Sequence, residues 1–365
     1  MPETNETKLC TLWRRLDMGG NWMQRVGAYR GLPTLARELG VDPTPVLLGA
    51  GLGPSALDDA DARIPFAALG HFLGACARIS GCEHVGLLAG RMWHLVDLGL
   101  VGELTRNAPT VRQALHVHTV HQHLNSGGGL AVMIDRCGVV DIGYAIYHPD
   151  VEAREQIFQA FMCATMNFLR ELCGATFVPM EVLFPFARPR SAEPYKRTFK
   201  CPVTFDAELC AIRLHAHWLA QPVPGADAER LRRAEVHAAE LSEDSLIDQV
   251  VRALRTLLLF GSDSGDEVAQ MLSMHRRTLN RRLQAAGTTF REVLDQARFD
   301  LACQLLTDSH ISLDDVAATL GYAGVSPFMR TFRRWAGTTP ARWRRAATAY
   351  RAATTHRAAP YAVTA

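Results

Sequence analysis

Two stretches of the sequence are rich in side chains that form hydrogen bonds with the edges of nucleic-acid bases. Residues 276–283 read Arg-Arg-Thr-Leu-Asn-Arg-Arg-Leu, and residues 325–334 read Val-Ser-Pro-Phe-Met-Arg-Thr-Phe-Arg-Arg. Arginine is the commonest side chain that contacts guanine through two hydrogen bonds, and asparagine can contact adenine in the same way. On an isolated helix, such arginines would more often form a solvated face. The interpretation therefore depends on the elements that position them.

Both stretches occupy the same place in a pattern that occurs twice. Residues 268–272 read Val-Ala-Gln-Met-Leu, and 48 positions later residues 316–320 read Val-Ala-Ala-Thr-Leu. Each copy continues through a small residue, Ser273 or Gly321, into its arginine-rich stretch and then to Gly-Thr-Thr. Small residues allow two helices to cross closely and permit a tight turn. The repeat predicts two helix-turn-helix motifs.

A long helix is predicted between the copies, at about residues 289–307, because apolar residues recur there every three or four positions. Its length would be roughly 28 Å, against about 34 Å between successive major grooves on one face of DNA. Helix starts are predicted by capping-box patterns at 264–267, 289–292 and 312–315. Pro327 and Pro340 are expected at first helical positions. Such a spacer could hold the two motifs one DNA turn apart.

Residues 246–345 resemble the C-terminal DNA-binding domain of AraC-family transcriptional regulators, especially from Gly321 to Pro340. The resemblance implies that double-stranded DNA is the partner, contacted in two adjacent major grooves. It implies base-reading roles for Arg277, Asn280, Arg281, Val325, Ser326, Met329 and Arg330. We assign the DNA backbone to the other arginines of the two helices: Arg276, Arg282, Arg333 and Arg334. His275 departs from the family pattern, which usually has Ser or Thr as the cap of the first recognition helix.

The N-terminal half resembles the arabinose-binding-like sensor domain that precedes this module in one branch of the AraC family. The resemblance covers about residues 32–222 and depends on residues 57–65, 86–90 and 98–104. Helices are expected at 66–80, 110–124 and 151–173, and strands at 130–134, 139–146, 178–184 and 203–214. We therefore predict an α+β sensor domain, followed by an all-α C-terminal domain with two helix-turn-helix motifs joined by a long helix.

Composition shifts divide the chain further. We expect a leader at 1–30, an effector-sensing and dimerisation domain at 31–222, a linker at 223–243, the DNA-binding domain at 244–346 and a disordered tail at 347–365. The helix at 151–173 carries soft side chains that could line an apolar cavity, although core packing explains such residues more often. These are Phe158, Phe161, Met162, Cys163, Met166 and Phe168.

Two other patterns suggest sites, and we interpret both as ordinary structure. Residues 35–40 imitate the start of another DNA-binding motif, but residues 41–48 contain two prolines and no basic residue, so no recognition helix is expected there. The histidines of the 116–123 cluster (His116, His118, His121 and His123) lie on one predicted helix. Four side chains at this spacing would not converge on a metal ion. We expect neither a metal nor a cofactor.

Charge and cysteine content restrict the class of protein. The 365 residues carry a formal net charge of only +2, so basic character is local to the recognition helices. Nine cysteines occur without any Cys-x-x-Cys, which favours reduced thiols and a cytoplasmic location. No signal peptide or membrane span is expected.

These patterns predict a sequence-specific transcriptional regulator that is controlled by a small-molecule effector and is not an enzyme. Further partners that we consider are RNA polymerase and a second copy of the chain. One alternative is a ligand-independent regulator whose N-terminal domain serves only dimerisation or polymerase contact. An enzyme alternative is a thiol-based DNA-repair methyl acceptor, which the cysteine spacings do not favour.

Overall fold

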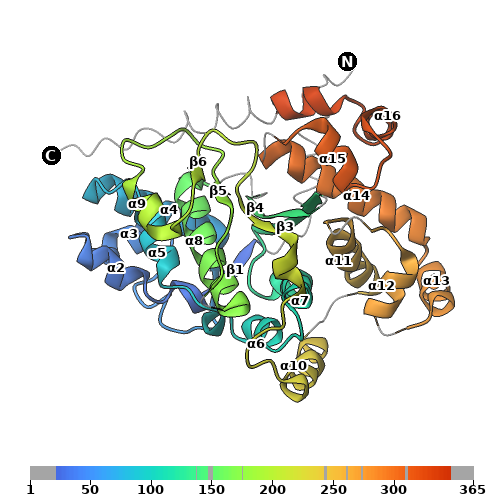
Figure 1. Ribbon diagram of the computed structural model, residues 1–365, viewed down its shortest axis with the longest axis horizontal. Coiled ribbons are helices and arrows are strands. Elements are labelled where there is room, and N and C mark those ends of the chain that lie inside the picture. The colour runs from blue at the N-terminus through green and yellow to red at the C-terminus, as the bar shows by residue number, and fades with distance from the viewer. Residues whose placement is uncertain are drawn as a thin grey trace.

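The computed structural model describes residues 22–346, except 137, 147–150, 175, 242–244, 260–261, 273 and 309–310. Two separate clusters of buried apolar side chains occupy the N-terminal and C-terminal parts of the chain. Figure 1 shows the helices of the C-terminal part beside the mixed helices and strands of the N-terminal part. The predicted fold classes are confirmed. The tail at 347–365 and most of the leader lie outside the described residues.

The N-terminal part contains a five-stranded sheet in the order β3-β4-β7-β5-β6. The strands are β3 (Gly129–Arg136), β4 (Val139–Ile146), β5 (Glu181–Leu183), β6 (Val203–Thr204) and β7 (Ala211–His215). All their pairings are antiparallel except β5 with β6. The predicted hairpin at 130–146 is confirmed, with Gly129 opposite Ile146. The single strand expected at 203–214 is wrong, because a loop separates β6 from β7.

A buried charge cluster joins the central strands of this sheet. Arg213 on β7 donates to both carboxylate oxygens of Asp141 on β4, at 2.7 and 3.0 Å. It also donates to Glu181 on β5 at 2.6 Å. The Asp141 side chain is only 1% exposed, so this ion pair lies largely away from solvent.

Helices surround the sheet, and several begin where the sequence predicts. These are α4 (Phe66–Ser80), α5 (Val85–Arg91), α6 (Leu100–Arg106), α7 (Val111–His121), α8 (Arg154–Cys173) and α9 (Glu193–Phe199). At the start of α7, Thr110 Oγ1 accepts a hydrogen bond from the Gln113 amide and caps the helix. Glycines allow α5 to pack closely on α8, because a β-carbon at Gly86 or Gly90 would meet α8 backbone oxygens at 2.1 Å.

The first described segment pairs with distant parts of the chain. Strand β1 (Met23–Arg25) pairs with β2 (Arg63–Pro65) on one side, and Gln24 forms an isolated bridge with Ser126 on the other. Four short 3-10 helices complete this part of the chain: η1 (Gly27–Tyr29), η2 (Leu95–Leu98), η3 (Gln122–Leu124) and η4 (Ala216–Ala220).

The proline-containing segment after residue 40, where no recognition helix is expected, forms a short helix. Helix α2 (Leu32–Glu38) ends before Gly40, and α3 (Pro43–Gly49) follows. Pro43 and Pro45 both fall in the first turn of α3, where amide groups lack helical partners anyway, so the prolines are tolerated. Because α3 still carries no basic residue and buries Val46 and Leu47, we assign it no DNA-reading role.

Between the two parts lies α10 (Ala228–Glu240), which is capped by Asp227. Ala234 and Ala238 on α10 form a small buried cluster with Leu104 on α6. This segment is therefore a helix packed onto the N-terminal part.

The C-terminal part consists of helices with the predicted duplicated arrangement. They are α11 (Leu246–Leu259), α12 (Gly265–Met271), α13 (Arg276–Ala285), α14 (Phe290–Asp308), α15 (Leu313–Thr319) and α16 (Val325–Ala336). A further helical segment spans 340–346, so Pro340 occupies a first helical position as expected. Pro327 is instead the third residue of α16, since the helix starts at Val325.

The 48-residue repeat is reproduced in the backbone hydrogen bonds. After α12, the Met274 amide donates to the Ala269 carbonyl at 2.9 Å, and after α15 the Tyr322 amide donates to Ala317 at 2.9 Å. Gly321 at the second turn has φ 75°, which favours glycine. Ser273, the predicted first turn residue, lies outside the described residues. Two equivalent helix-turn-helix motifs therefore flank α14.

Helix starts in this part follow the predicted caps. At α14, the Glu292 amide donates to Thr289 Oγ1 at 3.3 Å, and the Thr289 amide donates to the Glu292 carboxylate at 2.8 Å. The Thr289 amide, and then the Thr289 and Thr288 hydroxyls, donate to this carboxylate and lower the pKa of Glu292 below its usual value. The amides of Glu267 and Asp315 likewise donate to Ser264 and Ser312. All three predicted capping boxes thus mark real helix starts.

Candidate nucleic-acid interface and interior cavity

The first recognition helix, α13, presents a polar face outward. Leu279 and Leu283 are fully buried on its inner face. Arg277, Asn280 and Arg281 are exposed, and their spacing of three and four residues places them on one side of the helix. The structure thus brings together the three residues predicted to read bases in this motif.

Arg276 is placed differently from its neighbours on α13. Its guanidinium lies 3.9 Å from the ring centroid of Phe290, at the start of α14. It also occupies the space where Gly265 would carry a β-carbon. Arg276 therefore packs α13 against α12 and α14, whereas Arg282 is exposed. The local sequence did not distinguish these two arginines.

The start of α13 lacks a side-chain cap. His275 occupies the N-cap position with extended backbone geometry, φ −77° and ψ 145°, but its side chain accepts no hydrogen bond from the first turn. His275, the departure from the family pattern, therefore has N-cap backbone geometry without the cap bond.

The second recognition helix, α16, also has a buried apolar face and an exposed face, but its exposed face carries fewer hydrogen-bonding groups. Phe328 and Phe332 are fully buried on its inner side. Ser326, Met329 and Arg330 are exposed, whereas Val325 is half-buried against the core. Arg333 and Arg334 are exposed near its end, and Arg334 lies 3.5 Å from Asp295 on α14.

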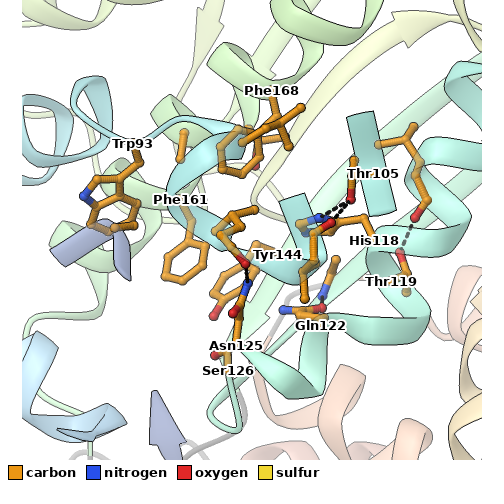
Figure 2. A pocket seen from close by; sticks show the side chains of 18 of the residues that line it. Trp93, Thr105, His118, Thr119, Gln122, Asn125, Ser126, Tyr144, Phe161 and Phe168 are labelled. Carbon is orange, nitrogen blue, oxygen red and sulfur yellow. Dashed lines mark hydrogen bonds between the residues drawn. The ribbon is translucent and has the colours of Figure 1, made fainter. Parts of the chain in front are cut away.

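A cavity lies inside the N-terminal part, between the sheet and helices α6, α7 and α8. The space open to the centres of water-sized atoms is ≈ 90 Å³. One water needs roughly 10–15 Å³ on this measure, so the cavity has room for a compact organic molecule. Figure 2 shows aromatic side chains on one side and the polar side chains of α7 and its C-terminal extension on the other.

Aromatic rings form much of the cavity wall. Tyr144 on β4 stacks on Phe161 of α8, with centroids 3.9 Å apart and an interplanar angle of 12°. Trp93 meets Phe161 edge-on at 5.7 Å. Phe161 and Phe168 are the two residues of the predicted soft cluster that line the cavity. The other four (Phe158, Met162, Cys163 and Met166) belong to the buried core.

His118 on α7 contributes the titratable group of the polar side. Its Nδ1 lies 3.5 Å from Thr105 Oγ1, and its ring is 6.1 Å from Phe168. Burial lowers the pKa of His118 to about 4, with a smaller contribution from His121. The side chain is therefore neutral at pH 7 and faces the cavity as an uncharged imidazole.

The neighbouring histidines diverge from His118. His121 Nδ1 lies 3.0 Å from the Val117 carbonyl, and His123 Nδ1 lies 3.0 Å from the Val120 carbonyl. Burial lowers the pKa of His116, and Glu267 on α12 opposes that shift. Among the described residues, no three His, Cys, Asp or Glu side chains form a group that could hold a metal ion.

The two functional regions are in direct contact. Helix α7, which lines the cavity with Leu115, His118 and Thr119, also packs against α11 of the C-terminal part. Strand β4, which carries Tyr144, packs against α14. In the described part of the chain, no helix is both long and apolar enough to cross a bilayer.

Comparison with known proteins agrees with both parts. Residues 40–223 match the family model of the arabinose-binding domain of AraC transcription regulators, and residues 268–346 match a helix-turn-helix domain. The transcriptional regulator VirS of Mycobacterium tuberculosis H37Rv is 29% identical over 320 residues, or 86% of this chain and 94% of that protein. The ornithine utilization regulator of Pseudomonas aeruginosa is 25% identical, over 88% of this chain and 96% of that protein.

Among solved structures, the chain is similar to the transcriptional regulator CdpR from Pseudomonas aeruginosa. The identity is 24%, the TM-score is 0.43, and the match covers 87% of this chain and 98% of CdpR. Because the arabinose-binding model and the helix-turn-helix model together span most of the described residues, the chain belongs to the AraC family of DNA-binding transcriptional regulators.

Proposed function

We propose that α13 and α16 enter two adjacent major grooves on one face of double-stranded DNA. One observation carries this proposal: both helices bury apolar faces and expose polar ones, and they pack at different points of α14, α13 beside Phe290 at its start and α16 beside Phe299 near its middle. The 19 residues of α14 span roughly 28 Å, comparable to the distance of about 34 Å between grooves.

Helix α13 would form more hydrogen bonds to base edges than α16. Arg277, Asn280 and Arg281 offer up to three hydrogen-bonding contacts to base edges. On α16, Ser326 and Arg330 can form hydrogen bonds, whereas Val325 and Met329 offer only apolar contact, for instance to a thymine methyl group. Arg282, Arg333 and Arg334 would contact phosphates. Because Arg276 already packs on Phe290, we give it a positioning role in place of a phosphate contact.

We further propose that a small molecule in the cavity of the N-terminal part controls DNA binding. The support is the double role of α7, which lines the cavity and also packs on α11. A ligand that moves α7 would change the support of the first helix-turn-helix. By linkage, DNA must then alter the affinity for the ligand by the same factor.

Footprinting of the full chain tests the reading of DNA. We expect two protected segments about one helical turn apart, with weaker protection of the first segment on Arg281→Ala and weaker protection of the second on Arg330→Ala. Ser80→Ala, a change at the end of α4, serves as a matched control that should leave both segments protected. A single short protected segment would contradict the two-groove arrangement.

The remaining partners follow from this role. We propose a cytoplasmic regulator, because its DNA partner lies there, with RNA polymerase and a second copy of the chain as further partners.

The thiol-repair alternative receives no support from the described cysteines. Burial raises the pKa of Cys76 and Cys201 to about 11 and that of Cys163 and Cys173 to about 12, which disfavours nucleophilic thiolates.

A further inference from the structure

Most polar side chains that line the cavity already have protein partners. Thr105 and Thr119 donate to carbonyls one turn earlier, at 2.7 and 2.8 Å. Gln122 accepts from the Ala131 amide at 2.9 Å and donates to the Gly129 carbonyl at 3.2 Å. Asn125 donates to the Leu98 carbonyl at 3.1 Å. These groups therefore shape the cavity and hold its walls together.

Three lining side chains are exceptions among the described residues: Trp93, whose buried indole Nε1 has no hydrogen-bond partner, and the pair Gln24 and Ser126. Gln24 and Ser126 face each other across an isolated antiparallel bridge and are each 5% exposed. Among the described residues, neither Gln24 Oε1 nor Ser126 Oγ has a hydrogen-bond partner, although Gln24 donates through Nε2 to the Arg25 carbonyl. A buried polar atom without a partner is costly, so the pair is suited to a bound molecule. It offers one acceptor beside a hydroxyl that can donate or accept.

The charged groups at the cavity are already engaged. Arg25 donates from Nε to Asp61 at 2.9 Å and from Nη1 to the Asp97 carbonyl at 2.8 Å. The Asp97 carboxylate accepts from the His94 amide at 2.9 Å. His118 is neutral at pH 7. A charged ligand would therefore lose its hydration without gaining a counter-ion.

The aromatic wall of the cavity favours a ligand that contains a planar ring. Tyr144, Phe161, Trp93 and Phe168 border the same space as His118 and Ser126, as Figure 2 shows. Aromatic rings pack favourably edge-to-face or in offset stacks on such side chains. The volume of the cavity limits the ligand to a compact molecule.

We infer that the cavity binds a compact, uncharged aromatic molecule that carries a hydrogen-bond donor next to an acceptor, as in a primary aryl amide. The donor is held by Gln24 Oε1 and the acceptor by Ser126 Oγ, while the ring packs on the aromatic wall. The regulatory consequence of this binding depends on the effector control proposed above; the binding itself does not.

Three compounds that share a phenyl ring and carry substituents of different charge test the ligand class on the full chain. Benzamide carries the neutral amide, benzoate is an anion and benzylamine is a cation, and L-arabinose and L-ornithine represent a sugar and a charged amino acid. Binding is measured by saturation-transfer NMR and by the thermal unfolding midpoint, because a ligand of the folded state raises that midpoint. We expect a saturable signal and a higher midpoint with benzamide alone. Stronger binding of any other compound, or no benzamide signal at millimolar concentration, would overturn the inference.

Two variants locate the binding site. Ser126→Ala removes the hydroxyl with little change in shape and should weaken benzamide binding about three- to tenfold. Thr165→Leu places extra bulk on the α8 side of the cavity and should abolish binding while the chain stays folded. Ser80→Ala, at the end of α4 and not in the cavity lining, is the matched control and should bind as the parent chain does. Unchanged binding by both cavity variants would place the site elsewhere.

A DNA-affinity measurement separates this inference from the proposed regulation. If benzamide binds and Thr165→Leu abolishes that binding, the ligand class stands whatever the effect on DNA. If such binding leaves the DNA affinity unchanged, effector control through this cavity is wrong. If a charged metabolite instead changes DNA affinity and benzamide does not bind, the regulation survives and the ligand class is wrong.

Discussion

Arg298, in the middle of α14, donates from Nη2 to the Asp263 carboxylate at 2.5 Å. Asp263 lies just before α12 of the first helix-turn-helix. The same guanidinium lies 5.2 Å from the ring centroid of Tyr322, in the turn of the second motif. Arg298 of the spacer helix therefore contacts both motifs, and its side chain is only 14% exposed.

Arg298→Leu should loosen the relative placement of the two motifs. The ion pair and the cation–π contact together contribute about 1–2 kcal/mol, so thermal stability should fall modestly. DNA affinity should fall more for a site with both segments than for a site in which one segment is randomised. Fluorescence anisotropy with the two DNAs measures this ratio. Asp263→Asn removes only the ion pair and should have a smaller effect; equal losses on both DNAs would contradict the bridging role.

Arg281 and Arg334 should differ in what they contribute to DNA binding. Arg281→Ala removes a contact to a base edge and should cost about 1–3 kcal/mol, with relaxed preference at one base pair. Arg334→Ala should weaken all sequences alike and lower the slope of affinity against salt by about one. Competition binding over a range of salt concentrations distinguishes the two. If Arg281→Ala leaves base preference unchanged, its assignment to a base is wrong.

The neutral state of His118 predicts a loss of stability in acid. Because its folded pKa, about 4, lies below the unfolded value of roughly 6.5, the unfolded state binds the proton more readily between these values. Stability is full above pH 6.5 and should decline as the pH falls towards 4, by about 3 kcal/mol at most. Urea unfolding of the parent chain and of His118→Leu at several pH values gives the difference. A difference that does not vary with pH would exclude this titration.

The uncapped start of α13 offers a simple gain in stability. His275 has N-cap geometry without a cap bond, so His275→Ser should supply an acceptor for the first-turn amides and stabilise the chain by about 1 kcal/mol. His275→Ala is the matched control, since it has no side-chain acceptor. Thermal unfolding midpoints compare the three proteins. Equal midpoints for the Ser and Ala variants would show that the cap cannot form.

The C-terminal architecture was predictable from the sequence, because its signals are local. Apolar spacing along α14, the Thr289–Glu292 capping box and the repeat from Val268 to Val316 each act within a few residues or recur at a fixed offset. The same spacing placed Leu279 inside and Arg281 outside. Pro327 does not mark the start of α16, which begins two residues earlier, whereas the prolines of α3 lie in its first turn, where they are compatible with a helix.

The cavity and the packing role of Arg276 could not be predicted, because both depend on contacts between distant parts of the chain. Gln24 and Ser126 are 102 positions apart, and the strand pairing that brings them together gives neither residue a local signature. Phe161 lines the cavity, whereas its neighbour Met162 is buried in the core, because the angle at which α8 packs on the sheet selects the residues that face the open space. Arg276 and Arg282 look alike in sequence, but only Arg276 lies against Phe290 and Gly265. Such contacts depend on how distant elements pack, which a single sequence does not encode locally.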